Sequence, residues 1–246
     1  MHKIELDPET VQRVVAWRGR RHMFEDIDPV RTAHLAIDMQ TAFLEQGSEL
    51  EVPEARAIPP VINRISKAVR DAGGLNVFVK FVVDAETVRT WPVWLNYFCR
   101  PDRASAMTEL FAEGAEGGAI DGSIEVEDGD LIVPKSRFGA FVPGASNLHE
   151  ILQARGIDTL IITGTVTYCC CESTARDAMQ MNYKVIFSSD GTAALSDSDH
   201  NATLNNMLSI FADVMDVNEI ESLLQRAAPP GRRVIGWATG YKPSST

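Results

Sequence analysis

The sequence predicts an α/β protein with three layers, α/β/α, around a mainly parallel, Rossmann-like sheet of about six strands. Short apolar runs alternate with amphipathic helical patterns along the 246 residues of the chain. This alternation is typical of a parallel sheet that is covered by helices on both faces. Hydrophobic residues make up 45% of the chain and charged residues 23%, which is ordinary for a globular protein with a buried core.

Each element follows from the pattern of its own residues. Pro59 and Pro60 open one helix and Gly73 ends it, with apolar residues between them at helical spacing. The strands are expected over residues 32–38, 75–83, 131–134, 160–163, 184–188 and 214–217. Helices are expected over residues 59–72, 146–156, 172–182, 197–211 and 218–227. Residues 84–118 are expected to be irregular, and they contain the densest aromatic patch of the chain, residues 91–98.

We expect three parts along the chain. Residues 1–30 are predicted to form a helical extension, with a helix from residue 7 to about residue 23 and a linker after it. The basic residues at the end of that helix suit its dipole, and the extension is expected to pack on the domain or on a second subunit. Residues 31–228 are predicted to form the main domain, and residues 229–246 a tail that begins with Pro229 and Pro230.

Composition excludes several classes of function. The formal net charge of −11 argues against nucleic acid as a partner, because phosphates need a basic surface. No apolar run reaches membrane-spanning length, and the first residues lack the apolar region of a signal peptide. Cys99 and three adjacent cysteines make a poor disulfide framework, so we expect thiols in the cytoplasm. No glycine-rich phosphate loop follows a strand, so no nucleotide cofactor is expected.

The three consecutive cysteines Cys169, Cys170 and Cys171 are the most informative feature of the chain. They lie between an apolar run that ends in Gly164 and a predicted helix, where backbone N–H groups favour a thiolate. This position predicts a nucleophile and favours an enzyme over a binding module. Structural zinc is the competing interpretation. Consecutive side chains that enter a helix point about 100° apart and cannot close one tetrahedral site.

Polar residues end three of the predicted strands. Asp38 ends the first strand, Lys135 follows residues 131–134, and Cys170 follows the strand at residues 160–163. Parallel strands place these ends at one edge of the sheet, where ligands bind in open α/β folds. A carboxylate beside a thiol accepts its proton, and a nearby ammonium favours both anions. The three residues therefore predict a histidine-free catalytic site.

Three segments resemble motifs of the isochorismatase-like cysteine hydrolase superfamily. Residues 36–43 read AIDMQTAF, similar to its D-M-Q-x-x-F strand end. Residues 133–141 read VPKSRFGAF, similar to its K-x-x-x-x-A-F segment. Residues 164–178 read GTVTYCCCESTARDA, similar to its G-x-x-T-x-x-C-V-x-x-T-x-x-D-A nucleophile turn. Order and spacing agree, and the resemblance extends over residues 32–224.

The resemblance implies a role for each site residue. Counted from Thr167, the nucleophile falls at Cys170, and Cys171 takes a position that is usually valine, so it is expected in the core. Asp38 would be the general base, and Lys135 would keep Asp38 and the thiolate charged. The backbone N–H groups of Val166 and Cys170 would bind the oxyanion, with a cis peptide bond between Thr165 and Val166.

Other residues are candidates for contact with the substrate. They are Gln40, Phe43, Trp91, Arg137 and Phe138. For the aromatic residues, ordinary packing is an equally good interpretation, and residues 91–98 can equally form a subunit contact. His200 and Asn201 open a helix on the same side of the sheet and are further candidates. His34 lies inside the first strand and is expected to be a hydrogen-bonded core histidine.

The resemblance also narrows the reaction. Nicotinamidases of this superfamily carry a metal site with histidines after the second strand, whereas residues 82–89 contain no histidine, so neither nicotinamidase activity nor a catalytic metal is expected. Cys170 favours cleavage of a C–N bond in a small molecule through an acyl-enzyme. The sequence is most similar to the branch of N-carbamoylsarcosine amidase, ureidoacrylate amidohydrolase and biuret-type hydrolases. A vinyl-ether hydrolase that does not need the cysteine and a non-catalytic oligomeric relative stay open. Family members usually assemble, so a homodimer or homotetramer is expected.

Overall fold

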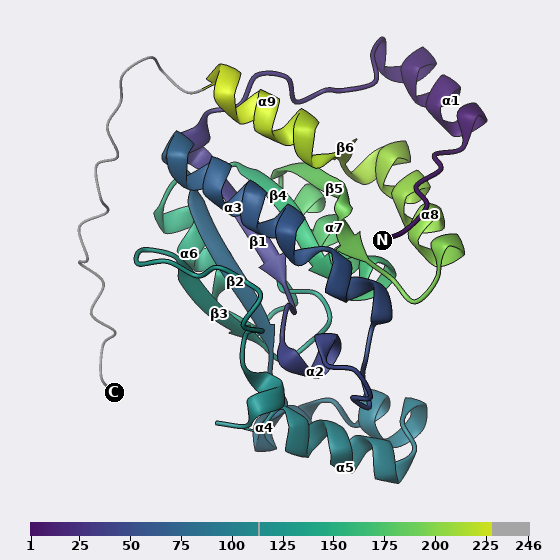
Figure 1. The fold of residues 1–246 in the computed structure, drawn as a ribbon, viewed down its shortest axis with the longest axis vertical. Helices are drawn as coiled ribbons and strands as arrows, with labels where there is room; N and C mark the ends of the chain where they lie inside the picture. The colour runs from purple at the N-terminus through teal and green to yellow at the C-terminus, as the bar shows by residue number, and fades with distance from the viewer. Residues whose placement is uncertain (113, 228–246) are drawn as a thin grey trace.

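The computed structural model describes residues 1–112 and 114–227, and its centre is one sheet of six parallel strands (Figure 1). The order across the sheet is β3-β2-β1-β4-β5-β6, and every neighbouring pair is parallel. The strands are β1 (Thr32–Ile37), β2 (Leu75–Phe81), β3 (Leu131–Lys135), β4 (Thr159–Thr165), β5 (Lys184–Ala193) and β6 (Asp213–Met215). The predicted α/β class and strand number are confirmed.

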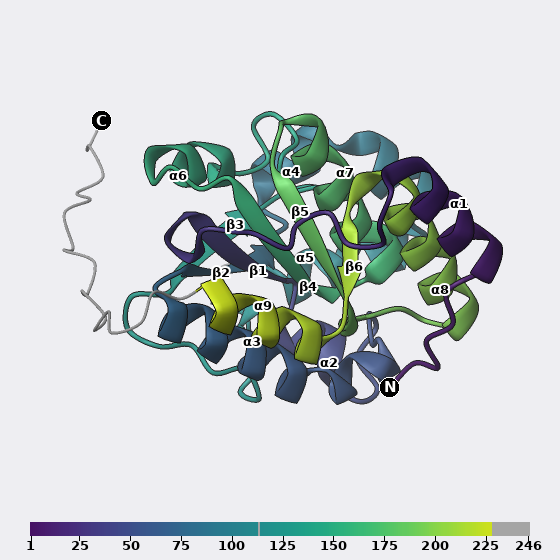
Figure 2. The same ribbon diagram turned by 90° about the horizontal axis from the view of Figure 1, so that it is seen from above.

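Helices cover both faces of the sheet, which completes the predicted three layers (Figure 2). Consecutive residues of β4 point to opposite faces: Leu160 and Ile162 join one buried cluster and Ile161 another. The face of Ile161 packs against α3 (Pro59–Ala72) and α9 (Val217–Ala227). The other face is covered by α1 (Pro8–Arg18), α6 (Leu148–Ala154), α7 (Glu172–Gln180) and α8 (Asp197–Asn206).

The first helix is shorter than expected. Asp7 caps α1 by accepting hydrogen bonds from the backbone of Glu9 and Thr10, and the helix ends at Arg18. Gly19 then adopts a left-handed φ of 80°, and its N–H bonds to the carbonyl of Val15. The prediction of a helix to about residue 23 was therefore wrong, because a glycine stop outweighed the basic residues that follow it.

Residues 84–118 were predicted to be irregular, and that prediction was also wrong. The segment contains α4 (Ala85–Thr90), a π-helical turn (Trp94–Phe98), α5 (Pro101–Leu110) and a 3₁₀ turn (Glu116–Gly118). Asp84 caps α4, and Pro101 opens α5, so local start signals were present in the sequence. In Figure 1 these helices lie beyond the carboxyl ends of the strands, next to α2 (Thr41–Leu44).

Shorter helical turns complete the fold. Two are 3₁₀ turns, Pro29–Arg31 and Pro53–Ala57, and two are π-helical, Thr167–Cys171 and Met207–Phe211. Within the described ranges, no helix combines the length and the apolar character that crossing a membrane requires. The predicted tail, residues 229–246, lies outside the described residues, and the predicted domain limits stay predictions.

Candidate active site

Three strand ends bring the predicted catalytic residues to one edge of the sheet. Asp38 directly follows β1, Lys135 is the last residue of β3, and Cys170 lies in the π-helical turn between β4 and α7. The Asp38 N–H donates to the carbonyl of Val79 at 2.8 Å, which holds the end of β1 against β2. Asp38 has a left-handed φ of 52°, an uncommon conformation for a residue with a side chain and one that recurs at functional sites.

Gly164 sets the distance between the cysteine turn and the end of β1. It pairs with Ile37 in the sheet and has a φ of 112°. A Cβ atom here would lie 2.0 Å from the carbonyl oxygen of Ile37, so only glycine fits. The Thr165–Val166 peptide bond that follows is cis, as the sequence led us to expect.

Asp38 and Lys135 form a fully buried ion pair. The Nζ atom of Lys135 lies 2.8 Å from Oδ2 of Asp38, and both side chains have 0% exposure. Nζ also donates to the carbonyl of Arg137 at 3.1 Å and lies 5.0 Å from the ring centre of Phe81. Oδ1 of Asp38 is buried and has no hydrogen-bond partner within the described ranges. One carboxylate oxygen is thus fixed by the lysine, and the other is open to a reacting group.

Burial and charge act in opposite directions on this pair. Burial raises the pKa of Asp38 above its usual value, although the charge of Lys135 and the nearby Cys170 thiol oppose this rise. Burial alone would lower the pKa of Lys135, but the negative charge of Asp38 and its hydrogen bond with the lysine act in the opposite direction, and the lysine pKa is raised. Lys135 therefore stays protonated, and Asp38 is a stronger base than a carboxylate in water.

The surroundings of Cys170, the predicted nucleophile, favour the thiol form, whereas the sequence predicted a thiolate. A hydrogen bond with Cys169 and burial raise the pKa of Cys170 well above its usual value. The same contact lowers the pKa of Cys169, which is only half-buried. The helix start therefore does not overcome burial at Cys170, and a base is needed to remove its proton.

The cysteine turn is held by its own backbone. The carbonyl of Val166 accepts hydrogen bonds from the N–H groups of Cys169 at 3.0 Å and Cys171 at 3.3 Å. Cys171 is fully buried in the core, and its Sγ lies 3.8 Å from the carbonyl oxygen of Thr163. The prediction of Cys171 as core packing is confirmed, and Cys170, at 6% exposure, retains a path to solvent.

Gln40 does not have the open side chain that a substrate contact requires. Its amide donates to the carbonyls of Phe81 at 2.9 Å and Gly118 at 3.1 Å, and its oxygen accepts from the N–H of Phe81 at 2.7 Å. The side chain is fully buried, and both amide hydrogens are used. Gln40 therefore joins β2 to the 3₁₀ turn Glu116–Gly118. Its role is structural, which corrects the expected contact with the substrate.

The aromatic candidates divide into two groups. Phe43 packs in the core, with its ring centre 5.5 Å from that of Phe111, so the packing interpretation holds for it. Trp91 and Phe138 are half-buried, with ring centres 4.8 Å apart, and the Arg137 guanidinium lies 4.9 Å from the Trp91 ring. Arg137 also donates to both oxygens of Thr90. These contacts connect residues 84–118, which lie beyond the carboxyl ends of the strands, to the loop after Lys135.

Of the two residues expected near the site on the next helix, one reaches it. His200 lies 3.0 Å from the Thr167 hydroxyl at the base of the cysteine turn. Asn201 instead binds the backbone of Lys3 and Glu5. His34 is a hydrogen-bonded core histidine, as predicted, with Thr163 Oγ1 at 2.7 Å, and burial lowers its pKa to about 4.

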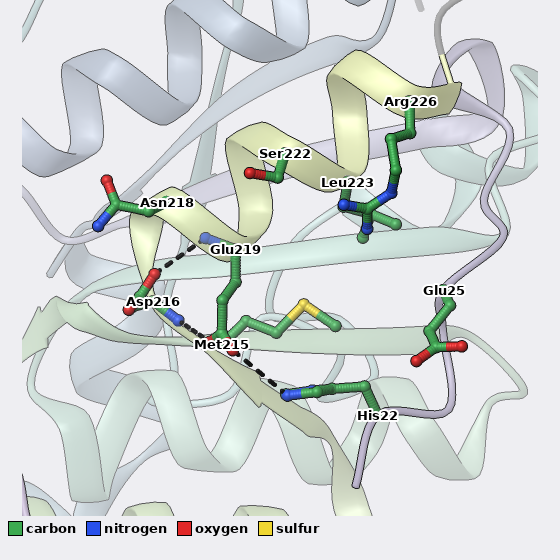
Figure 3. Close-up of a pocket in the computed structure, with 9 residues that line it drawn as sticks. All are labelled: His22, Glu25, Met215, Asp216, Asn218, Glu219, Ser222, Leu223 and Arg226. Carbon is green, nitrogen blue, oxygen red and sulfur yellow. Dashed lines mark hydrogen bonds and ion pairs between the residues drawn. The ribbon is translucent and has the colours of Figure 1, made fainter. Parts of the chain in front are cut away.

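A cavity of about 390 Å³ lies away from this site, along α9 (Figure 3). It is lined by the linker before β1, the end of β6 and α9, and His22 points across it to Glu219. None of its lining residues belongs to the strand ends that carry Asp38, Lys135 and Cys170. The predicted catalytic residues therefore lie outside this cavity, although the Ser222 hydroxyl lines it.

Side chains suited to metal binding do not converge in the described ranges. Residues 1–112 and 114–227 contain no cluster of three or more His, Cys, Asp and Glu side chains that could hold a metal ion. Asp84, in the segment where nicotinamidases carry their metal ligands, caps α4 by accepting from the N–H and hydroxyl of Thr87, both at 2.7 Å. Its carboxylate therefore serves the local fold.

Known proteins resemble the chain in sequence and in fold. A ureidoacrylate amidohydrolase, RutB, from Methylobacterium radiotolerans is 32% identical over 227 residues, which is 85% of this chain and 86% of the relative. A probable inactive nicotinamidase from Arabidopsis thaliana is 33% identical over 76% of this chain and 93% of its own. A cysteine hydrolase from Pseudomonas syringae has a TM-score of 0.73 at 28% identity, covering 82% and 95% of the two chains. N-carbamoylsarcosine amidase from Thermoplasma acidophilum has the same fold, with a TM-score of 0.62 at 24% identity, and the match covers 76% of this chain and 96% of the amidase.

The isochorismatase domain model matches residues 32–219, and the chain therefore belongs to the isochorismatase domain family.

Proposed function

We propose that this protein is a cysteine amidohydrolase that cleaves a C–N bond of a small amide, ureido or carbamoyl compound. The observation that carries the proposal is the buried ion pair between Lys135 and Asp38. The second carboxylate oxygen of Asp38 has no hydrogen-bond partner in the described ranges, and the Cys170 thiol is close enough to influence the pKa of this carboxyl. A buried acid with an open oxygen beside a thiol has the arrangement of a general base and its nucleophile.

In the first step, Cys170 attacks the carbonyl carbon of the substrate. The thiol proton moves to Asp38 as the S–C bond forms, and Lys135 remains charged throughout. This transfer leaves the net charge of the buried group unchanged, which keeps its cost low in a region without water. The raised pKa of Asp38 brings its basicity closer to that of a thiolate and so favours the transfer.

The backbone of the cysteine turn would stabilise the oxyanion. In this proposal the N–H groups of Val166 and Cys170 donate to the oxygen that becomes negative. The neighbouring N–H groups of Cys169 and Cys171 are already bound to the carbonyl of Val166, which fixes the shape of the turn. One such donor contributes about 3 kcal/mol to lowering the barrier.

The acyl-enzyme is then released by water. When the C–N bond breaks, Asp38 gives its proton to the leaving nitrogen, which departs as ammonia or an amine. Asp38 next takes a proton from water as the hydroxyl adds to the carbonyl carbon. The C–S bond breaks, and the proton returns to Cys170, so the enzyme is regenerated.

The relatives support this class of reaction. The ureidoacrylate amidohydrolases act on non-peptide C–N bonds by name, and the chain is a hydrolase of that kind. Within the class we propose that Trp91, Arg137 and Phe138 line the substrate pocket. Trp91 belongs to residues 84–118, which lie beyond the strand ends, and Arg137 and Phe138 follow Lys135 and contact Trp91. We further propose a cytoplasmic homodimer or homotetramer. Tyr97 and Phe98, which are 82% and 73% exposed, are candidates for its interface.

An ammonia-release screen tests the proposal. The purified protein is assayed with small amides, ureides and carbamoyl amino acids, beside Cys170→Ser and the adjacent control Cys169→Ser. We expect at least one ureido or carbamoyl substrate to be cleaved, with Cys170→Ser about 10³-fold slower in kcat and Cys169→Ser within about fivefold of the original. Intact-mass spectra of quenched reactions should show the acyl group on Cys170.

Three outcomes would contradict the proposal. If Cys170→Ala retains full activity, the cysteine is not the nucleophile, and a vinyl-ether substrate becomes the better interpretation. If no compound is cleaved and none acylates the protein, the chain is a non-catalytic relative. Loss of activity in Cys169→Ser with retention in Cys170→Ser would move the nucleophile to the neighbouring residue.

A further inference from the structure

We propose that two histidines from distant parts of the chain, His200 and His2, position the turn that carries Cys170, with Thr167 as the link. This proposal deepens the proposed function and rests on it, because it assigns positioning residues to the same site. The three residues lie on the first segment of the chain, on α8 and in the cysteine turn, and all three are buried. The roles proposed above for Asp38, Lys135 and Cys170 do not use them.

The contact between Thr167 and His200 has a defined direction. The Nε2 atom of His200 lies 2.9 Å from the carbonyl oxygen of Ser189. A carbonyl oxygen can only accept, so Nε2 carries the hydrogen and Nδ1 is an acceptor. The Thr167 hydroxyl, 3.0 Å from Nδ1, must therefore donate. Because Thr167 is the first residue of the turn that contains Cys170, this bond fixes the base of the nucleophile turn.

His2 holds His200 from the other side. The two rings are stacked, with centres 4.3 Å apart and planes 18° apart. Nε2 of His2 accepts from the N–H of Ala194 at 2.9 Å, and Nδ1 lies 2.7 Å from Oδ1 of Asp197. By the same reasoning the ring donates to Asp197 through Nδ1. His2 thus closes the open face of the His200 ring and fixes its plane.

Ala193, the neighbour of Ala194, contacts the residue that precedes Val166. The Thr165 hydroxyl donates to the carbonyl of Ala193 at 3.4 Å. Thr165 and Thr167 flank Val166, whose N–H is one of the proposed oxyanion donors. The two histidines and the end of β5 therefore support both sides of the residue on which transition-state stabilisation depends.

The first seven residues are placed by α8 itself, which explains how His2 arrives at this position. Asp197, Asn201 and Asn205 lie four residues apart and so on one face of the helix. Their side chains accept from the backbone N–H groups of Lys3 at 3.3 Å, Glu5 at 2.8 Å and Asp7 at 2.9 Å. Asn201 also donates to the carbonyl of Lys3 at 2.9 Å. In Figure 1 this segment runs along α8.

The electrostatics agree with a positioning role. Burial lowers the pKa of His200 to about 4, and the neighbouring His2 contributes to this shift. A neutral ring keeps Nδ1 free to accept from Thr167 near neutral pH. A role for His200 as a proton carrier in the reaction is disfavoured by the same two hydrogen bonds, because both of its nitrogens are engaged.

Two substitutions of His200 separate its two hydrogen bonds. His200→Asn keeps an acceptor near the Nδ1 position for Thr167, whereas His200→Gln keeps only a donor near the Nε2 position for Ser189. We expect His200→Gln to lower kcat about 30-fold with KM changed less than about threefold, and His200→Asn to stay within about fivefold of the original. His2→Ala should lower kcat about fivefold. His149→Gln, which alters a histidine bound to Tyr183, is the control and should change nothing.

A second readout does not depend on turnover. Alkylation by iodoacetamide is followed across pH by fragment-ion mass spectrometry, which resolves Cys169, Cys170 and Cys171. Loosening of the turn should return the Cys170 thiol toward ordinary acidity, so His200→Gln should label Cys170 faster at pH 7.5 while kcat falls. Cys171, fully buried in the core, should stay unlabelled, which separates a local change from general unfolding.

The results decide the proposal in either direction. It is overturned if His200→Gln and His200→Asn behave alike in kcat and in Cys170 labelling, or if Cys171 becomes labelled together with Cys170. If no substrate is cleaved by the unsubstituted protein, the proposed function fails. The labelling difference between the Asn and Gln variants then still supports or overturns the positioning role.

Discussion

Two buried aspartates of this protein, Asp38 and Asp213, have similar surroundings and opposite uses. Both are at most 1% exposed, and each pairs with one basic side chain. Oδ2 of Asp213 accepts from the backbone N–H groups of Met23 at 2.6 Å and Phe24 at 2.9 Å, and Oδ1 lies 3.3 Å from Nδ1 of His22. The carboxylate therefore ties the first segment of the chain to β6.

Asp38 differs in the partners of its carboxylate. In both residues Oδ1 is buried and has no hydrogen-bond partner within the described ranges, but Oδ2 of Asp38 is held by Lys135, and the Cys170 thiol is close enough to influence the pKa of that carboxyl. We therefore interpret Asp213, which is held by two backbone donors and paired with a histidine, as an anchor, and we propose Asp38, which lies beside a thiol, as the base. Burial alone does not distinguish the two aspartates, but their partners do.

The largest expected difference is in activity. Asp38→Asn removes the base and leaves the charge of Lys135 uncompensated, so kcat in the ammonia-release assay should fall about 10³-fold. Asp213→Asn keeps an oxygen that accepts from Met23 and Phe24, and its kcat should stay within about threefold. Similar losses in both variants would show that Asp38 has no special chemical role.

A second prediction concerns stability. Complete removal of the Asp213 side chain should lower the stability of the fold and leave the activity of the folded protein unchanged. Asp213→Ala leaves two backbone N–H groups without their acceptor and His22 without its ion-pair partner, which should lower the free energy of unfolding by about 3 kcal/mol in urea denaturation. The folded fraction should retain its kcat at saturating substrate. An Asp213→Ala protein as stable as the original would contradict the role of anchor.

The smallest effect concerns pH. The contact with the Asp213 carboxylate raises the pKa of His22 above 6.5, despite partial burial, and the charge of Glu219 acts in the same direction. A raised folded pKa means that this contribution is fully present below pH 6.5 and is lost as pH rises through the folded pKa. His22→Gln should therefore cost about 1 kcal/mol of unfolding free energy at pH 6 and progressively less by pH 9. A cost that is constant with pH would rule out a charged His22.

Much of the fold and of the site could be predicted from local sequence. Gly164 is required by the close approach of Ile37, and it appears in the chain as the glycine of a strand end. Asp38, Lys135 and Cys170 each follow an apolar run, so their common edge follows once the sheet is parallel. The helices after Asp84 and Pro101 were missed although their start signals are local, because the aromatic residues between them suggested irregular structure.

Other features had no local signal. The direction of the pKa shift of Cys170 was predicted wrongly, because a helix start is visible in the sequence, whereas the burial of Cys170 and its contact with Cys169 are not. Gln40 belongs to a recognisable motif, but the backbone groups that bind its amide come from Phe81 and Gly118. His2 carries no signal at all, although the spacing of Asp197, Asn201 and Asn205 marks a polar face on α8.

The sequence by itself determined the order of strands and helices, the family and the three residues at the strand ends, because each depends on patterns within a few neighbouring residues. Only the tertiary structure decided which carboxylate oxygen is open, in which direction the pKa of each thiol is shifted and which histidine contacts the cysteine turn. These properties depend on burial and on contacts between residues up to 198 positions apart, such as the stacked pair His2 and His200. Folding brings these groups together, and no local pattern records the contact.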